Sequence, residues 1–149
     1  MGDRANIVIR SDWPEDLGEK EAVFLHSHWG GHELPETLRL GLLRAKGEEG
    51  NWSRDNRWGD ETYLARLVFQ EMIGDNDENT GYGISTRLTD HEYDLLVLFE
   101  QRVFVLSVND YELNGFDSIR DARSISFADY VEMERTWENL TEVVAGDRA

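Results

Sequence analysis

The chain contains no cysteine, which excludes disulfide bonds, a thiol nucleophile and every metal site built on thiolates. Only 2 of its 149 residues are proline, and no low-complexity tract or internal repeat is present. It has no apolar run of about 18 residues, so no membrane-spanning helix is expected. The N-terminal segment lacks a basic start followed by an apolar run, so a secretory signal peptide is not expected either. We therefore expect a cytoplasmic protein.

Basic residues are scarce, and lysine is the scarcest of them. Lys and Arg number 15 against 31 Asp and Glu, which leaves a formal net charge of −16, and Lys20 and Lys46 are the only lysines. A chain this acidic repels phosphates, so direct binding to DNA or RNA is not expected. Two interpretations of the charge remain open. It keeps the surface solvated at high salt, or it arranges carboxylates that imitate a phosphate backbone and occupy a basic groove on a partner protein.

Apolar and aromatic residues are plentiful despite the charge. Hydrophobic residues make up 40% of the chain, including 5 Trp, 5 Tyr and 6 Phe, which excludes a disordered protein. The length suits a single domain over residues 1–149 with a sizeable core.

Hydrophobic periodicity predicts strands and helices in the order ββααβββα, or ββααββα in a shorter version. The expected strands are 6–10, 22–26, 83–88, 94–99 and 102–108, and the expected helices are 34–46, 61–73 and 127–144. Pro35 suits the first helical turn, and Asp60 suits an N-cap. This order predicts an α+β fold with three helices and a mainly antiparallel sheet of about five strands, and it does not predict a Rossmann-type fold.

Residues 25–36 read LHSHWGGHELPE and contain three of the four histidines. Residues two apart on a strand share a face, so His26 and His28 would point the same way. A glycine pair follows and can turn the chain back, which would bring His32 and Glu33 to the same place. Three neutral imidazoles suit zinc, with an open position for a water nucleophile. The spacing matches no established metal motif, and the alternative is one half-buried histidine beside two solvated ones.

The segment 47–59 is long for a connection between two helices. It contains Trp52 and Trp58, with Arg54 and Arg57 between them. Either the tryptophans pin this loop to the core, which is the commoner role, or the aromatic and guanidinium groups form a patch that stacks a base or holds an anion.

Three segments in this order carry a resemblance: HWGGHELPE at 28–36, YLARLVFQEMI at 63–73 and TGYGIST at 80–86. The chain resembles a group of small uncharacterised proteins from actinobacteria and from viruses of prokaryotes. The similarity covers roughly residues 22–106. It implies that His28, with Trp29 and the two glycines after it, is the shared feature, whereas His26 and His32 are features of this chain. The resemblance implies no activity.

Together these patterns favour a non-catalytic binding protein that recognises an anionic small ligand or a basic host protein. The resemblance implies an accessory factor of a virus or mobile element, which would lie in the host cytoplasm if the source is a virus. The residues expected to bind the ligand are His28, Trp29, Gly30, Gly31, Trp52, Arg54, Arg57, Trp58 and Tyr82. One alternative is a metal-dependent hydrolase that holds zinc with His26, His28 and His32. A second is a structural or assembly component of a virion.

Overall fold

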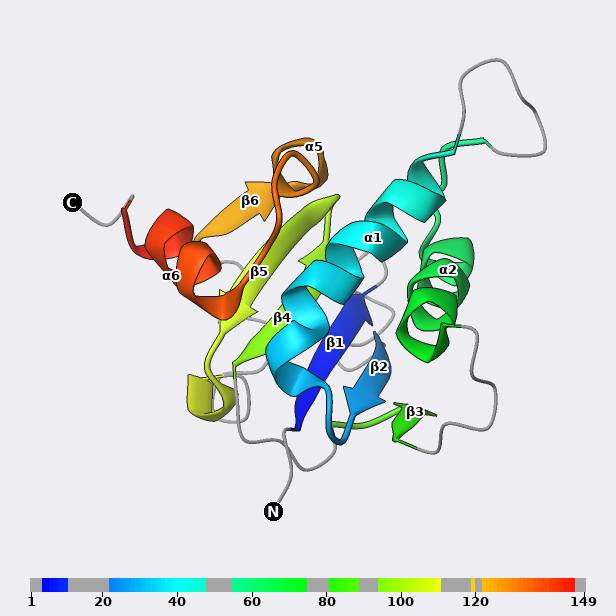
Figure 1. Ribbon diagram of the computed structural model, residues 1–149, viewed down its shortest axis with the longest axis horizontal. Helices are drawn as coiled ribbons and strands as arrows, with labels where there is room; N and C mark the ends of the chain where they lie inside the picture. Colours follow the sequence, from blue (N-terminus) through cyan, green and yellow to red (C-terminus); the bar gives the residue numbers. More distant parts are fainter. Residues whose placement is uncertain are drawn as a thin grey trace, which may run out of the picture.

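In the parts of the chain that the structure, a computed structural model, describes, six β-strands form one mixed sheet (Figure 1). The structure describes residues 4–10, 22–47, 55–74, 81–88, 94–110, 119 and 122–146. Within these residues the strand order is β3-β2-β1-β4-β5-β6. Neighbouring strands are antiparallel except β1 and β4, which are parallel. The predicted α+β class with a mainly antiparallel sheet is therefore confirmed.

The strands lie close to the expected positions. They are β1 (Ala5–Arg10), β2 (Ala22–Ser27), β3 (Tyr82–Ser85), β4 (Leu95–Phe99), β5 (Arg102–Leu106) and β6 (Ser124–Ser126). The expectation of about five strands is wrong by one, because β6 also pairs with β5. A strand of 3 residues is too short to show a two-residue hydrophobic period.

Both faces of the sheet carry a hydrophobic core. Side chains alternate along β1, so Ile7 and Ile9 belong to the core beneath the helices, and Val8 belongs to the core of the opposite face. The central strand β4 is buried on both faces along its first four residues, as its unbroken apolar sequence predicts.

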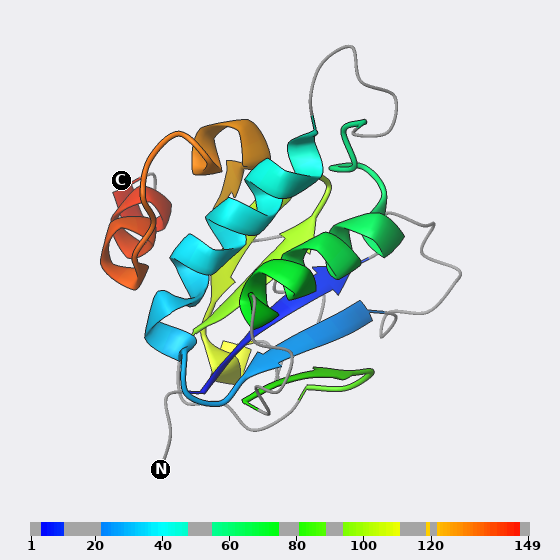
Figure 2. The same cartoon turned by 45° about the vertical axis from the view of Figure 1, so that its right-hand side comes forward.

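Two long helices cover one face of the sheet (Figures 1 and 2). They are α1 (Leu34–Lys46) and α2 (Glu61–Ile73), with the bounds expected from the sequence. The Asp60 side chain accepts a hydrogen bond from the backbone N–H of Tyr63, so it is the N-cap of α2 as predicted. The bounds of both helices could be predicted because the residues that cap a helix lie directly next to it in the sequence.

The prediction of a single helix over residues 127–144 is wrong. The chain forms α5 (Phe127–Tyr130), leaves helical geometry, and enters α6 (Trp137–Gly146). A 3-10 turn, η2 (Gly31–Glu33), was also not expected, and it leads directly into α1. No helix in the described parts of the chain has the length and apolar character needed to cross a membrane.

A buried arginine explains the break between α5 and α6. The Arg135 guanidinium donates from Nε to the carbonyl oxygen of Tyr130 at 2.8 Å and from Nη2 to that of Asp129 at 2.7 Å. These carbonyls would accept the next backbone N–H groups if the helix continued. Thr136 then begins α6, because its Oγ1 accepts a hydrogen bond from the backbone N–H of Asn139.

Candidate functional site

The HWGG turn, residues 28–31, connects the end of β2 to the start of α1. Three hydrogen bonds fix its backbone. The His28 N–H donates to the carbonyl of Gly81 at 2.8 Å, the Gly30 N–H donates to Ser27 Oγ at 3.0 Å, and the Glu33 N–H donates to the carbonyl of Gly30 at 3.1 Å. The turn is thus held both by its own residues and by the segment that enters β3.

Gly30 allows close packing within the turn. A Cβ atom at Gly30 would lie 3.1 Å from Ser27 Oγ and 3.1 Å from the Tyr82 hydroxyl oxygen. Gly31 is buried, and its carbonyl accepts a hydrogen bond of 2.8 Å from Trp137 Nε1. Sequence reasoning missed Trp137 as a support of this turn, since it lies 106 residues further along the chain.

Trp29 stands at the surface of the turn. Its side chain is 58% exposed, and its ring stacks on that of His28 with a centroid distance of 4.2 Å and an interplanar angle of 7°. Arg4 Nη2 lies 3.1 Å from His28 Nε2, at hydrogen-bonding distance, so the imidazole contacts both a guanidinium and an indole. Arg4 is a second residue that sequence reasoning missed. The result is an exposed aromatic side chain held in a defined orientation.

Tyr82, at the start of β3, borders the turn as expected. Burial raises the pKa of its phenol, and the negative charge of Glu33 adds to the shift. The phenol therefore stays neutral across the physiological range and keeps a hydrogen to donate.

The three histidines considered for zinc are not gathered into one group. The His26 and His28 ring centroids are 6.4 Å apart, and His26 Nδ1 lies 3.2 Å from the Asn6 side-chain oxygen. His32 is 65% exposed and lies 3.5 Å from the carboxylate of Glu33. Among the described residues, no set of three or more His, Asp or Glu side chains is placed to hold a metal ion. A zinc site here stays a prediction without geometric support.

The loop between α1 and α2 supplies the other expected binding residues. Trp52 and Arg54 lie outside the described residues. Trp58 Nε1 donates to the carbonyl of Leu42 at 2.8 Å, which pins this end of the loop to α1. The Arg57 guanidinium lies 4.5 Å from the Tyr63 ring centroid and 3.9 Å from the Asp60 carboxylate.

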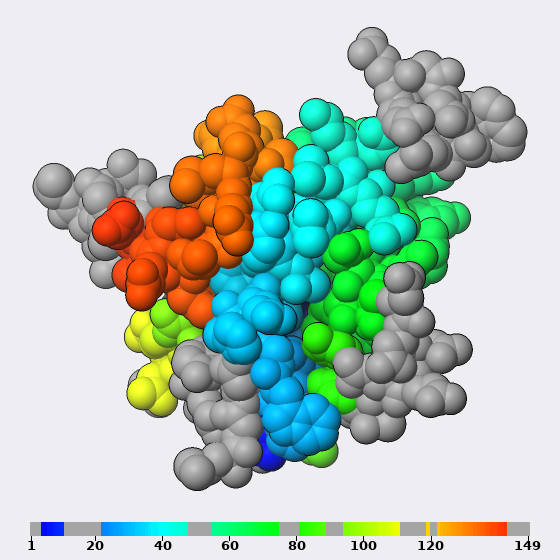
Figure 3. Space-filling view, in the orientation of Figure 1, coloured from blue at the N-terminus to red at the C-terminus, as the bar shows by residue number. Residues whose placement is uncertain are grey.

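Arg57 and Trp58 do not join the HWGG turn. They follow the C-terminal end of α1, whereas the turn precedes its N-terminal end, and a helix of 13 residues is about 20 Å long. Figure 3 shows the helical layer from outside, with α1 between α2 and the C-terminal helices. The residues expected to bind the ligand therefore divide, within the described parts of the chain, into two regions at opposite ends of α1. The first contains His28, Trp29, Gly30, Gly31 and Tyr82.

The chain was compared with protein-family models, with curated proteins and with solved structures, and none of the three comparisons finds a match. The proposed function of the chain therefore rests on the geometry of the turn and on the charge of the molecule.

Proposed function

We propose that the protein is a non-catalytic interaction protein that docks onto a basic protein through the HWGG turn, with Trp29 as the anchor. One observation carries the proposal: the Trp29 side chain is exposed to solvent and yet is held in one orientation. Large aromatic side chains that are held rigidly at a surface contribute much of the binding energy of protein interfaces. Stacking on His28 orders the indole before any partner arrives, which lowers the entropic cost of binding.

The charge of the chain supports a basic partner over an acidic one. A net charge of −16 attracts cationic surfaces over distances of about 10 Å and repels anionic ones. The tryptophan face also suits a guanidinium from such a partner, because cations are attracted to aromatic ring faces. In keeping with the resemblance to proteins of prokaryotic viruses, we propose that the partner is a host protein and that this chain is an accessory factor.

The test compares the wild-type protein with Trp29→Ala and with Met133→Ala, a control that removes another side chain of similar exposure, 51% against 58%. Each variant is used to capture proteins from a lysate of the source or host cell. The affinity of the purified partner is then measured by calorimetry at low and high salt. We expect a positively charged partner that binds Trp29→Ala about 30-fold more weakly, corresponding to about 2 kcal/mol, and Met133→Ala normally. Its affinity should also fall with added salt.

If the partner binds Trp29→Ala as tightly as it binds the wild-type protein, the assignment of Trp29 as the anchor is overturned. A partner with a net negative charge, or binding that does not change with salt, would overturn the assignment of its class.

A second candidate, binding of an anionic small ligand such as a nucleotide, is favoured by one observation. The Arg4 guanidinium lies beside His28, whose ring stacks on the exposed Trp29, so a base and a phosphate have partners near one turn. Titration with ATP, followed by amide chemical shifts, tests it. Shifts at residues 28–31 that disappear in Trp29→Ala would favour the small ligand, whereas the leading proposal expects none.

A further inference from the structure

Strand β3 lies at one edge of the sheet (Figure 2). Within the described parts of the chain, β2 is the only strand that pairs with it. An edge strand presents a row of backbone N–H and C=O groups with which a strand of another chain can pair, and natural proteins commonly protect such an edge with charged residues or proline. The sequence of β3 is Tyr-Gly-Ile-Ser, which contains neither. This edge is therefore open to another strand.

The outward-facing backbone groups of β3 belong to Tyr82 and Ile84. The His28 N–H donates to the Gly81 carbonyl at 2.8 Å, in the same register as the β2–β3 ladder. Hydrogen-bonded pairs alternate with non-bonded pairs in an antiparallel ladder, so Gly83 bonds toward β2 and the residue on each side of it does not. Tyr82 and Ile84 thus each present an N–H and a C=O group to a strand that approaches from outside.

The side chains of β3 also suit a neighbouring strand. Ile84 is 62% exposed, the largest exposed fraction among the large hydrophobic side chains that the structure describes. It lies opposite Leu25, which belongs to the core beneath the helices. An apolar side chain on an added strand would therefore cover Ile84 and extend this core.

Gly83 is a glycine that the rest of the described chain does not require. Its φ is not positive, and a Cβ atom there would meet nothing within 4 Å. A glycine inside a strand weakens the strand, and it often marks a place where a ligand or another backbone approaches closely. Gly83 therefore leaves room beside the edge for the side chains of an added strand.

The sequence on either side of β3 is strongly acidic. Residues 75–94 contain one basic residue, Arg87, and six acidic ones, which are Asp75, Asp77, Glu78, Asp90, Glu92 and Asp94. Opposite charges attract across an interface and steer its partners together. The charge of this part of the chain therefore favours an added strand that contains basic residues.

We propose that an extended segment of a basic partner protein adds to β3 as a further strand of the sheet, with apolar and basic side chains alternating along it. Its backbone would bond to Tyr82 and Ile84, and its apolar side chains would lie beside Ile84. The edge adjoins the HWGG turn, because Gly81 accepts the bond from His28. The inference rests on the proposed function for the partner's being a basic protein, and it adds the conformation in which that partner binds.

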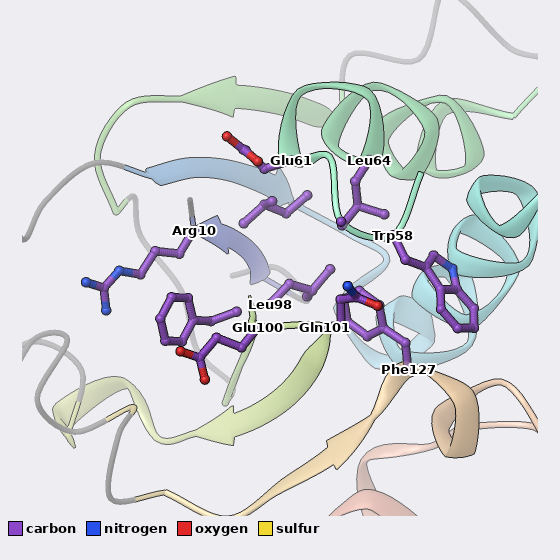
Figure 4. A pocket seen from close by; sticks show the side chains of 11 residues that line it. Arg10, Trp58, Glu61, Leu64, Leu98, Glu100, Gln101 and Phe127 are labelled. Carbon is purple, nitrogen blue, oxygen red and sulfur yellow. The ribbon is translucent and has the colours of Figure 1, made fainter. Parts of the chain in front are cut away.

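Strand addition requires no cavity, since hydrogen bonds between main chains supply the affinity. The hollow lined by Trp58, Leu64 and Phe127 is a different kind of feature (Figure 4). It has room for about one water molecule, so a side chain of a partner does not enter it. The contact proposed here therefore lies on the open sheet edge.

The probe is a hexapeptide of alternating arginine and valine, acetylated and amidated at its ends. Its control is the same peptide with every backbone amide N-methylated, which keeps the charge and removes the backbone donors. Binding to the full chain is followed by amide chemical shifts and by amide hydrogen exchange. We expect the probe to bind with a dissociation constant of about 0.1–1 mM, as suits a short flexible peptide, and the control to bind at least about tenfold more weakly. Exchange at the Tyr82 and Ile84 N–H groups should slow about tenfold on saturation with the probe.

Two variants at one position separate the backbone contact from the side-chain contact. Ile84→Pro removes the outward N–H and leaves the bonds to β2, a position at which an edge strand accepts proline, and it should weaken the probe about tenfold. Ile84→Thr keeps the N–H and the branched shape, and it should weaken the probe only about twofold to threefold. The amide spectrum of each variant shows whether it is folded. If Ile84→Pro does not fold, the N-methylated peptide tests the same hydrogen bonds on the wild-type protein.

Equal binding of the N-methylated peptide, or exchange at Tyr82 and Ile84 that the probe does not slow, would overturn the inference. So would a dimer of the free chain in which these N–H groups already exchange slowly, because a second copy would then occupy the edge. Probe binding should be unchanged in Trp29→Ala, which shows that the edge acts without the anchor. A partner whose affinity depends on Trp29 and not on Ile84→Pro would support the proposed function and overturn strand addition.

Discussion

Glu36 connects α1 to the segment that follows α5. Its carboxylate accepts hydrogen bonds from Arg39 Nε at 2.7 Å and Nη2 at 2.6 Å. It also accepts the backbone N–H of Arg135, 99 residues further along the chain, at 3.0 Å. These bonds lower the pKa of Glu36, the bond from Arg39 having the largest effect. Glu36, which in the sequence looks like an ordinary surface glutamate, thus helps to hold the buried Arg135 in position.

The charge of Glu36 predicts that the free energies of unfolding of the wild-type protein and of Glu36→Gln differ by an amount that depends on pH. Because its pKa in the folded chain is below the ordinary value of 4.5, its stabilisation is present above that value and is lost as the pH falls through the lowered pKa. We expect Glu36→Gln to lower the free energy of unfolding by about 1–2 kcal/mol at pH 7. The difference should close as the pH falls below 4.5. Urea unfolding at several pH values measures it.

The control is Glu142→Gln, an exposed glutamate on α6, which should change the stability little at any pH. A difference between wild type and Glu36→Gln that stays constant with pH would contradict the assignment of the effect to the charge.

At the level of elements, the contact between α1 and α2 depends on a glycine. A glycine inside a helix destabilises it by about 1 kcal/mol relative to alanine, so Gly41 is unexpected from helix propensity alone. A Cβ atom there would lie 3.0 Å from Val68 Cα and 3.2 Å from Val68 Cγ2. The cost within the helix is therefore offset by close approach of the two helix backbones.

This contact predicts that Gly41→Val destabilises the protein by about 2 kcal/mol or more, since a branched side chain would force the helices apart. Thermal and urea unfolding measure the loss. Leu43→Val, on the outer side of α1 where the side chain is 39% exposed, is the control and should cost about 0.5 kcal/mol. A Gly41→Val protein as stable as the control would show that the helices can separate freely.

At the scale of the whole molecule, the net charge of −16 opposes the compact state through self-repulsion. We expect sodium chloride between about 0.05 and 1 M to raise the free energy of unfolding by about 1–3 kcal/mol, because salt screens this repulsion. Urea carries no charge and is the denaturant of choice for the measurement. Potassium chloride should have the same effect as sodium chloride, since screening does not depend on the cation.

A stability that is independent of salt would contradict the solvation interpretation of the charge. It would leave the second interpretation, carboxylates arranged for a basic partner, as the explanation of the same composition.

The sequence alone determined the features that depend on neighbouring residues. The bounds of α1 and α2 follow from the residues beside their ends, and the alternation along the strands follows from a period of two. His28, Gly30 and Tyr82 were expected to bind one ligand together, and the structure places them near one another, whereas Trp58, expected in the same set, lies toward the other end of α1.

The tertiary structure alone decided the features that join distant parts of the chain. The break after α5 depends on a buried arginine held by Glu36, and the HWGG turn depends on Trp137. The separation of Trp58 from the turn follows from the length of α1. Local preferences act over a few residues, whereas these contacts form only when the folded chain brings remote groups within hydrogen-bonding distance.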